Sequence, residues 1–183
     1  MKTRPTLKTD RLILRPFEIS DGPRVMKLAG DPEIAATTLA VPHPYLEGMA
    51  ETWISRHQEN FEKGTGLQFA IVLKSTDELI GCIDFCAMSK AHNKAEIGYW
   101  VGRPFWGQGY CSEACQALIK YGFEELKLNR IVARHMSGNP ASGKVMIKSG
   151  MKQEGVLRQD ICKNSVYYDS VIYGILHSEY QPK

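Results

Sequence analysis

Residues 95–114 read AEIGYWVGRPFWGQGYCSEA, and this stretch decides the fold of the chain. Its first part, Ala95 to Val101, has the aromatic and β-branched composition of a strand, and the glycines and proline of residues 102–109 end that strand. Ser112 then opens an amphipathic run that is typical of a helix. The predicted order is therefore strand, glycine-rich turn and helix.

The glycine-rich turn has the composition of an anion-binding site. The first amides of a helix lack intrahelical partners, and the helix dipole adds roughly half a positive charge at that end. Gly107 and Gly109 carry no Cβ, so the backbone can approach a phosphate closely. We therefore predict that the turn binds a phosphate, in particular a pyrophosphate.

Three phosphate-binding motifs compete for this assignment. A dinucleotide-binding fingerprint needs a third glycine where Ser112 stands and an acidic residue after a second parallel strand, and the spacing does not supply them. Residues 138–144 approximate a Walker A loop, but Val145 stands where a hydroxyl should bind Mg²⁺. The acyl-CoA motif Gln/Arg-x-x-Gly-x-Gly/Ala fits residues 106–111, with substitutions at Trp106 and Cys111.

With this third motif, the sequence resembles the GNAT acetyltransferase superfamily, specifically its RimJ/RimL-type branch of ribosomal-protein N-terminal acetyltransferases. The resemblance runs from Leu7 to about Tyr180, in four blocks in family order: residues 7–16, 95–114, 139–142 and 168–173. It implies an α/β (α+β) fold with one N-acetyltransferase domain over residues 1–183 and a core of about 7–180. Its mixed, mostly antiparallel central sheet is expected to be splayed at its middle and flanked by helices.

Composition excludes several other classes of protein. A chain of 183 residues that is 43% hydrophobic and 23% charged suits one globular domain. The net charge of +3 is too small to argue for a nucleic-acid surface. The first five residues lack an apolar core, and no apolar run approaches the roughly 20 residues of a membrane span. We expect a cytoplasmic monomer or homodimer with no nucleic-acid or membrane partner.

The five cysteines do not form a disulfide framework pattern, because their number is odd. Cys82 and Cys86, like Cys111 and Cys115, lie four residues apart, which is wider than the usual zinc spacing, and no histidine repeats at ligand spacing. We expect no metal site and assign these cysteines to the core. His57, on a helical stripe, is expected to be packed or solvent-facing.

Patterning predicts the remaining elements. They are a strand over residues 12–16, a short helix ended by Gly30, an irregular segment over 31–44, one helix over 46–61, strands over 67–74 and 79–85, a helix from 112 to about 126–129, a strand over 131–136, a helix from Asn139-Pro140 to Gly150, and strands over 151–163 and 166–180. The strands of residues 67–101 should form an antiparallel meander, and those flanking the helix at 112 should run parallel.

The resemblance implies that acetyl-CoA is the cosubstrate. Its pantetheine arm would lie along Tyr99 to Val101 like an added strand, and its pyrophosphate would meet the glycine turn. The implied cofactor-binding residues are Tyr99, Trp100, Val101, Trp106, Gly107, Gln108, Gly109, Tyr110, Cys111, Ser112, Asn139 and Ser142. Arg103 and Lys144 are candidates for contacts with the outer phosphates of CoA.

The resemblance also implies catalytic residues. Glu96 matches the acidic strand position that serves as base in several relatives, although a strand carboxylate can equally pair with a neighbouring cation. An Asp84 nearer the thioester would replace it. Met146 stands where many members carry a proton-donating tyrosine, so Ser142 is assigned to the leaving group and Asn139 to positioning. Both of these residues can also act as helix caps.

The predicted function is transfer of an acetyl group from acetyl-CoA to a primary amine by direct attack in a ternary complex. The acceptor is a peptide N-terminus, possibly of a ribosomal protein, or a small-molecule amine. At pH 7 an α-amine with a pKa near 8 costs only about 1.4 kcal/mol to deprotonate, against about 4.6 kcal/mol for a lysine. A thiol at a helix N-terminus has a lowered pKa, so an acetylated Cys111 is conceivable. The alternatives are a non-catalytic acyl-CoA-binding module and a nucleotide-dependent enzyme.

Overall fold

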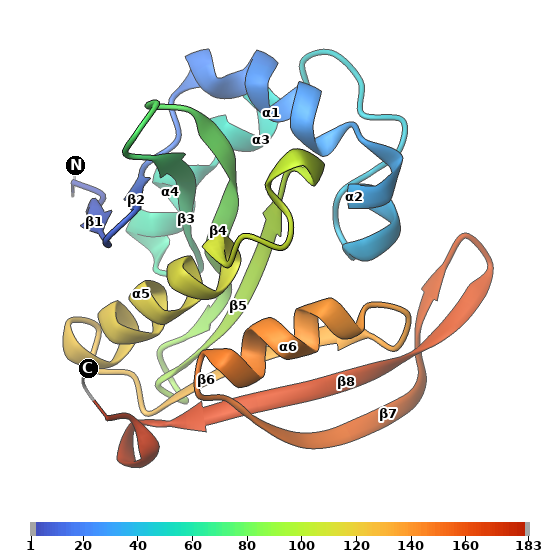
Figure 1. Cartoon of the computed structure of the whole chain (residues 1–183). Coiled ribbons are helices and arrows are strands. Elements are labelled where there is room, and N and C mark those ends of the chain that lie inside the picture. Colours follow the sequence, from blue (N-terminus) through green and yellow to red (C-terminus); the bar gives the residue numbers. More distant parts are fainter. Residues whose placement is uncertain (1–2, 182–183) are drawn as a thin grey trace.

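One eight-stranded sheet organises the part of the chain that the computed structural model describes, residues 3–181 (Figure 1). The strands are β1 (Leu7–Lys8), β2 (Leu12–Arg15), β3 (Leu67–Leu73), β4 (Leu79–Ser89), β5 (Lys94–Val101), β6 (Arg130–Met136), β7 (Lys152–Lys163) and β8 (Val166–Leu176). Their spatial order is β1-β2-β3-β4-β5-β6-β8-β7. All neighbours are antiparallel except β5 and β6, which are parallel. The mixed, mostly antiparallel sheet confirms the predicted fold class.

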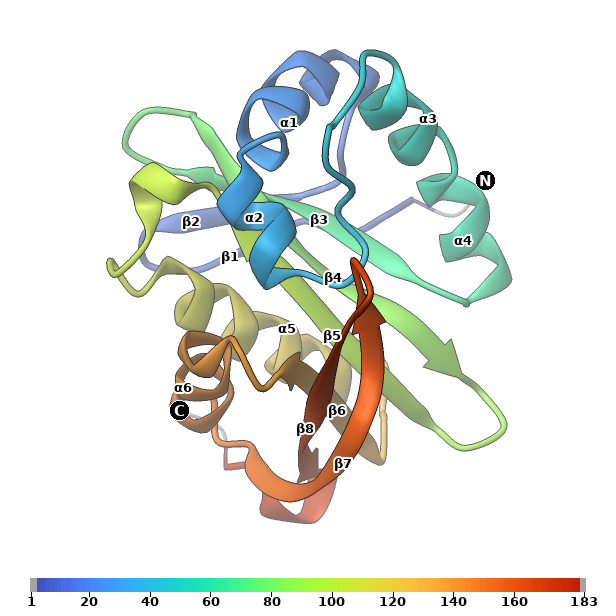
Figure 2. The ribbon, with the colours of Figure 1, turned by 90° about the vertical axis from the view of Figure 1, so that its right-hand side faces the viewer.

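Helices cover both faces of the sheet. They are α1 (Gly22–Ala29), α2 (Pro32–Thr37), α3 (Met49–Ser55), α4 (His57–Lys63), α5 (Tyr110–Glu124) and α6 (Pro140–Lys148), with short 3-10 turns at residues 19–21, 103–105 and 177–179. Helices α1 to α4 lie together on one side of the molecule, and α5 and α6 lie on the other (Figure 2). Within residues 3–181 no helix combines the length and the apolar character needed to cross a membrane.

Strand β3 shows why the sheet needs helices on both sides. All seven of its residues are buried, and successive side chains of a strand point to opposite faces. Phe69 and Ile71 therefore join the core under α5, whereas Ala70 and Val72 join a second core under α1 and α3. A mostly apolar strand that is buried along its whole length is stable only when both faces are covered.

The predicted splay lies between β5 and β6. The two strands pair from Lys94 and Arg130 as far as Ile97 and Ala133, and pairing then stops. Both strands continue, β5 to Val101 and β6 to Met136. The last residues of β5 therefore have a partner strand only on the β4 side, and the sheet opens at this point.

Local sequence signals set several turns as predicted. Asn139 caps α6 by accepting a hydrogen bond from the Ser142 amide, and Pro140 occupies the first helical position. Gly150 follows this helix with a φ of 89°, a conformation that suits glycine. A Cβ at Gly81 would lie 2.3 Å from the Trp100 carbonyl oxygen, so the backbones of β4 and β5 approach closely at this glycine. The register of β3 and β4 also shifts beside Gly81, which marks a β-bulge.

Three element predictions are corrected. The segment over 31–44 is not wholly irregular, because the Asp31 side chain accepts from the Glu33 amide and Pro32 begins helix α2. The single helix over 46–61 is two helices, since a 3-10 hydrogen bond from the Arg56 amide to the Trp53 carbonyl tightens the chain between α3 and α4. Helix α5 ends at Glu124, slightly before the predicted end.

The tip of the β7–β8 hairpin reaches the end of α2, as Figure 2 shows. The Lys163 ammonium donates to the carbonyls of Ala35 and Thr38. From the loop before α6, the Asn139 Nδ2 donates to the Thr37 carbonyl at 2.9 Å. Two elements from the C-terminal half thus satisfy carbonyl groups at the end of α2, and this joins the two halves of the splayed sheet.

His57 is a buried core residue. Its ring packs edge-on against Phe17 and Trp53, with ring centroids at 5.6 and 4.3 Å. Neither ring nitrogen has a hydrogen-bond partner within the described residues. Burial, together with the charge of Arg4, lowers the pKa of His57 from 6.5 to about 4. The packed alternative predicted from the helical stripe is confirmed.

The free energy of unfolding should therefore fall between pH 6.5 and pH 4. In this range His57 is protonated in the unfolded chain but stays neutral in the folded protein. The contribution of neutral His57 to the free energy of unfolding is therefore complete above pH 6.5. Near pH 4 about 3 kcal/mol of this contribution is lost. Urea unfolding across this range should show a smaller loss for His57→Phe than for the wild type. The exposed His92→Asn is the control and should follow the wild type. Parallel curves for the wild type and His57→Phe would contradict the expectation.

Candidate active site

A cleft of about 1220 Å³ opens where β5 and β6 separate. Its walls come from the segment between α1 and α3, the facing ends of β4, β5 and β6, the glycine turn and helix α6. Glu96 and all the predicted cofactor-binding residues except Gln108 line it. The Gln108 side chain instead donates to the Pro104 carbonyl at 3.1 Å. The structure thus brings two of the four sequence blocks, residues 95–114 and 139–142, together around one cavity.

The glycine turn has the conformation that its sequence requires. Gly107 and Gly109 have φ values of 75° and 80°, in the left-handed region that favours glycine. Gly109 is the N-cap of α5 and provides no side-chain cap. Within residues 3–181 the amides of Gly107, Gln108 and Gly109 donate to no other backbone group. These amides and the first amides of α5 are therefore available to an anion, which fits the pyrophosphate of CoA.

A clamp from the start of the chain fixes this turn. The Arg11 guanidinium donates from Nε to Glu113 Oε2 at 2.6 Å and from Nη1 to the Gln108 carbonyl at 3.0 Å. It also lies over the Tyr110 ring, 4.6 Å from the ring centroid. The Thr9 hydroxyl and the Arg11 amide donate to Glu113 Oε1. Burial acts to raise the pKa of Glu113, but these hydrogen bonds outweigh it and lower the pKa.

Arg11 lies in the family block of residues 7–16, and the sequence analysis predicted no role for it. Arg11 and Glu113 are 102 residues apart, and no local pattern pairs them. A signal was present, since an arginine at a turn before a strand and a glutamate in the first turn of the phosphate helix are both charged positions near the predicted site. Only the sheet order brings the two together.

On the α5 and α6 side of β5, Tyr99 contacts the predicted leaving-group residue. Its hydroxyl lies 2.8 Å from Ser142 Oγ and donates to the Ser142 carbonyl at 3.0 Å. Burial raises the pKa of Tyr99, so its hydroxyl keeps its proton. Both ends of the Asn139 amide are engaged, with Ser142 and with the Thr37 carbonyl. Met146 is buried in the core below α6.

On the opposite face of β5, Glu96 is held in an ion pair. The Arg134 guanidinium donates from Nε to Glu96 Oε1 at 2.8 Å and from Nη2 to Oε2 at 3.1 Å. The sequence analysis had named pairing with a neighbouring cation as the alternative for this carboxylate, and that pairing is present. A catalytic role for Glu96 stays a prediction. Asp84 lies on the adjacent strand, directly opposite Gly98, and lines the same cleft.

Cys111 does not have the lowered thiol pKa that its position at a helix N-terminus favours. Burial raises the pKa of the Cys111 thiol well above its ordinary value, and the neighbouring Cys115 adds to the effect. The thiol is therefore protonated at neutral pH and is a poor nucleophile. The alternative of a small side chain that leaves room beside the turn fits the structure.

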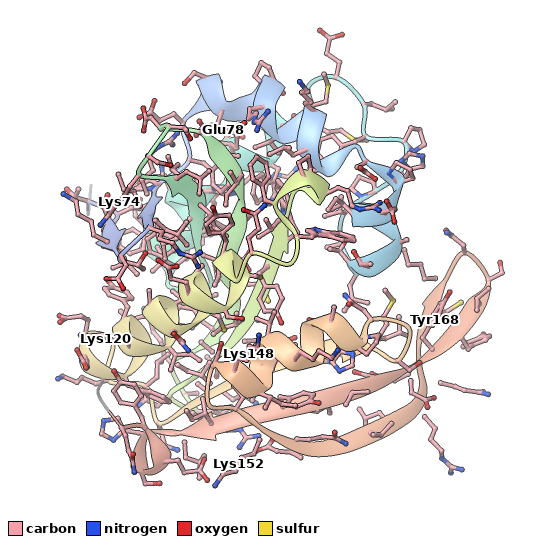
Figure 3. The ribbon with its side chains drawn as sticks, viewed as in Figure 1. Lys74, Glu78, Lys120, Lys148, Lys152 and Tyr168 are labelled. Atoms are coloured by element: carbon pink, nitrogen blue, oxygen red, sulfur yellow. The ribbon has the colours of Figure 1, made fainter. Side chains whose placement is uncertain are left out.

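Two of the cations that line the cleft come from helix α6. They are Lys144, which the sequence analysis named, and Lys148 one turn later. Figure 3 labels Lys148 on helix α6. Arg103 does not line it, because its guanidinium pairs with Glu33 and lies 5.3 Å from the Trp106 ring centroid. Lys148 is a functional candidate that the sequence analysis missed, although its spacing of four residues from Lys144 puts both on one helix face.

Comparisons with known proteins agree with this geometry. Residues 11–152 match the acetyltransferase (GNAT) domain family. The chain is 34% identical over 175 residues to the uncharacterized N-acetyltransferase YoaA of Bacillus subtilis, covering 94% of this chain and 97% of that protein. It is 35% identical over 117 residues to the ribosomal-protein-serine acetyltransferase of Escherichia coli, covering 64% and 62%.

A solved structure shows the same fold. RimL, a ribosomal L7/L12 α-N-protein acetyltransferase in complex with coenzyme A, superposes with a TM-score of 0.87 at 22% identity, covering 94% of this chain and 98% of that chain. The expected resemblance is thereby confirmed. The chain belongs to the GNAT acetyltransferase family and is an acetyl-CoA-dependent N-acetyltransferase, and its relatives are consistent with the RimJ/RimL-type branch.

Proposed function

We propose that this enzyme transfers the acetyl group to the primary amine of a peptide N-terminus or of a small molecule, by direct attack within a ternary complex. The observation that carries the proposal is the distribution of side chains about β5. Glu96 and Gly98 share one face with Asp84 of β4, whereas Tyr99 points to the other face and contacts Ser142. Acceptor and donor can therefore meet at β5 from opposite sides.

Acetyl-CoA would occupy the α5 and α6 side of the cleft. The edge of β5 from Gly98 to Val101 lacks a partner on the β6 side, so the amides of a pantetheine arm can pair with it as an added strand does. The free amides of residues 107–109 would bind the pyrophosphate. Lys144 and Lys148 supply positive charge at the same cleft.

The acceptor would enter from the α1–α3 side, where apolar side chains form much of the cleft wall. Its lining side chains there include Ile34, Leu39, Val41, Tyr45, Met49 and Trp53. Leu39 and Met49 are exposed. This wall favours an amine that carries an uncharged neighbouring group, as a peptide N-terminus does. The likeness to a ribosomal-protein-serine acetyltransferase also supports a peptide acceptor.

In the reaction, the amine nitrogen attacks the thioester carbonyl, a C–N bond forms, and the C–S bond then breaks. The sulfur leaves with the bonding electrons and takes a proton from the attacking nitrogen. The Ser142 hydroxyl is proposed to donate a hydrogen bond to that sulfur, while the Tyr99 hydroxyl donates to the Ser142 carbonyl and so positions this residue. No acyl-enzyme intermediate is required, which agrees with the raised pKa of Cys111.

Release of CoA from acetyl-CoA, measured against a panel of amines, tests the proposed function. The panel holds peptides with N-terminal serine or alanine, polyamines, amino acids and aminoglycosides. We expect turnover with one acceptor class, and the peptides are favoured because the acceptor wall is apolar. Thermal stabilisation by CoA but not by ATP with Mg²⁺ is expected in parallel. Stabilisation by CoA without turnover on any amine would support the non-catalytic binding module instead.

Gly109→Ala should weaken acetyl-CoA binding. A side chain at a φ of 80° is strained by about 1–2 kcal/mol, which corresponds to a roughly 10-fold higher KM for acetyl-CoA if the turn distorts to relieve it. Gly155→Ala is the matched control, because a Cβ there has no neighbour within 4 Å and its φ is not positive. An unchanged KM in Gly109→Ala would argue against phosphate binding at this turn.

Ser142→Ala should lower kcat about 100-fold with little change in the KM for acetyl-CoA, because it removes a donor needed when the sulfur leaves. The substitution keeps the helix cap, since Asn139 accepts from the Ser142 amide. Tyr99→Phe should lower kcat by a smaller factor, because it only frees the Ser142 hydroxyl to rotate. Tyr167→Phe, at an exposed position on β8, is the control. A kcat in Ser142→Ala equal to that of the wild type would exclude the leaving-group role.

A further inference from the structure

We propose that Asp84 is the general base that takes the proton from the acceptor amine, and that the ion pair with Arg134 withholds Glu96 from this role. The inference rests on the proposed function and names the proton acceptor at that same site. Asp84 lies on β4, whereas the sequence analysis assigned the base to Glu96 on β5.

The position of Asp84 places its carboxyl over the expected thioester site. Asp84 and Gly98 are directly opposed in the antiparallel register of β4 and β5. A Cβ built on Gly98 would lie only 2.7 Å from Asp84 Oδ1. The carboxyl therefore covers Gly98, and a larger residue there would have to displace it. Since Gly98 is the first residue of β5 beyond the last β6 pair, the carboxyl sits at the start of the splay.

Asp84 has no cationic partner within residues 3–181. In the described part of the chain the ion pairs include Glu96 with Arg134 but none with Asp84. An ionised carboxylate away from water costs stability unless a cation or several donors compensate it. A half-buried carboxyl that lines a cavity and lacks such compensation is typical of functional sites.

The groups around Asp84 leave its proton affinity high. The charged or titratable groups that line the cleft on the elements around Asp84 are Cys82 and Cys86 on β4, Glu96 on β5, Arg134 on β6, and Tyr45, Glu47 and Arg56 in the segment from α2 to α4. Burial raises the pKa of Asp84 to about 7; the Gly98 amide opposes this shift and the negative charge of Glu96 adds to it. A base with a pKa near 7 is suited to an α-amine with a pKa near 8.

The proton transfers balance in two steps. The ionised Asp84 takes one proton from the acceptor ammonium, and the neutral amine then attacks the thioester carbonyl carbon. When the C–S bond breaks, the sulfur receives the second proton from nitrogen. The products are the amide, the thiol of CoA and protonated Asp84, which returns its proton to solvent.

The pH dependence of kcat in Asp84→Asn and Glu96→Gln tests the proposal with two acceptors of different amine pKa. In the wild type we expect kcat to rise with a midpoint near pH 7 that is the same for both acceptors. Asp84→Asn should lose this midpoint and at least about 100-fold in kcat while keeping its affinity for CoA. Glu96→Gln should keep a pH midpoint, shifted to lower pH because the negative charge of Glu96 no longer raises the pKa of Asp84. Asp160→Asn, at an exposed position on β7, controls for the loss of a carboxylate.

A titration that needs no turnover and no variant gives the second readout. In protein labelled with ¹³C only at aspartate carboxyls, one resonance should titrate near pH 7, while Asp21, whose pKa is lowered, should titrate at acidic pH. If every aspartate titrates below about pH 5, or if Asp84→Asn keeps the wild-type profile, Asp84 is not the base. Absence of acetyl transfer by the wild type to every amine, with the resonance still near pH 7, would instead overturn the proposed function.

Discussion

The loss of pairing between β5 and β6 beyond Ile97 and Ala133 is the constraint on which the rest of the structure depends. A parallel pair that stays closed would leave no space between the two halves of the sheet. Because this pair opens, the last residues of β5 have no partner strand on one edge, and both of their side-chain faces border a cavity. The sheet therefore supplies a binding strand and two catalytic faces from a single segment.

An open sheet needs contacts that hold its halves at a fixed separation, and the structure provides two sets. On one side, Arg11 and Thr9 bind Glu113 and fix the start of α5 against the first strands. On the other side, Lys163 and Asn139 bind carbonyls at the end of α2. Exposed ion pairs contribute little stability singly, but here they are combined with hydrogen bonds to backbone carbonyls. Their main effect is on the position of the glycine turn and the acceptor wall.

Sequence analysis succeeded where the signal was local. A few adjacent residues determine each of three local structures. These are the glycine turn before α5, the start of α6 at Asn139-Pro140 and the strands around Gly81. Helix α2 was missed although Asp31-Pro32 is also a local signal, because the surrounding prolines were interpreted as irregular structure. The apolar residues of 46–61 recur at one helical spacing through both α3 and α4, because the two helices share a buried face. The sequence pattern therefore did not reveal the break at Arg56.

The site was predictable only in part, because its side chains are joined by long-range contacts. The turn, β5 and Ser142 were found from motifs, and all three line the cleft. The contacts of Tyr99 with Ser142, of Glu96 with Arg134 and of Arg11 with Glu113 join residues 43, 38 and 102 positions apart. Such pairs follow from sheet order and register, which the pattern of a single sequence does not encode.

The charges on the acceptor face explain why this face favours an acceptor that enters as an ammonium ion. Glu96 and Arg134 neutralise each other, so ionisation of Asp84 leaves one uncompensated negative charge in a mostly apolar cleft. An entering ammonium supplies the missing positive charge and favours the ionised carboxylate; by linkage, an ionised Asp84 favours the ammonium equally. Transfer of the proton then leaves two neutral groups, which a poorly solvated site accommodates best. The burial that raises the pKa of Asp84 thus also promotes the formation of the reactive amine.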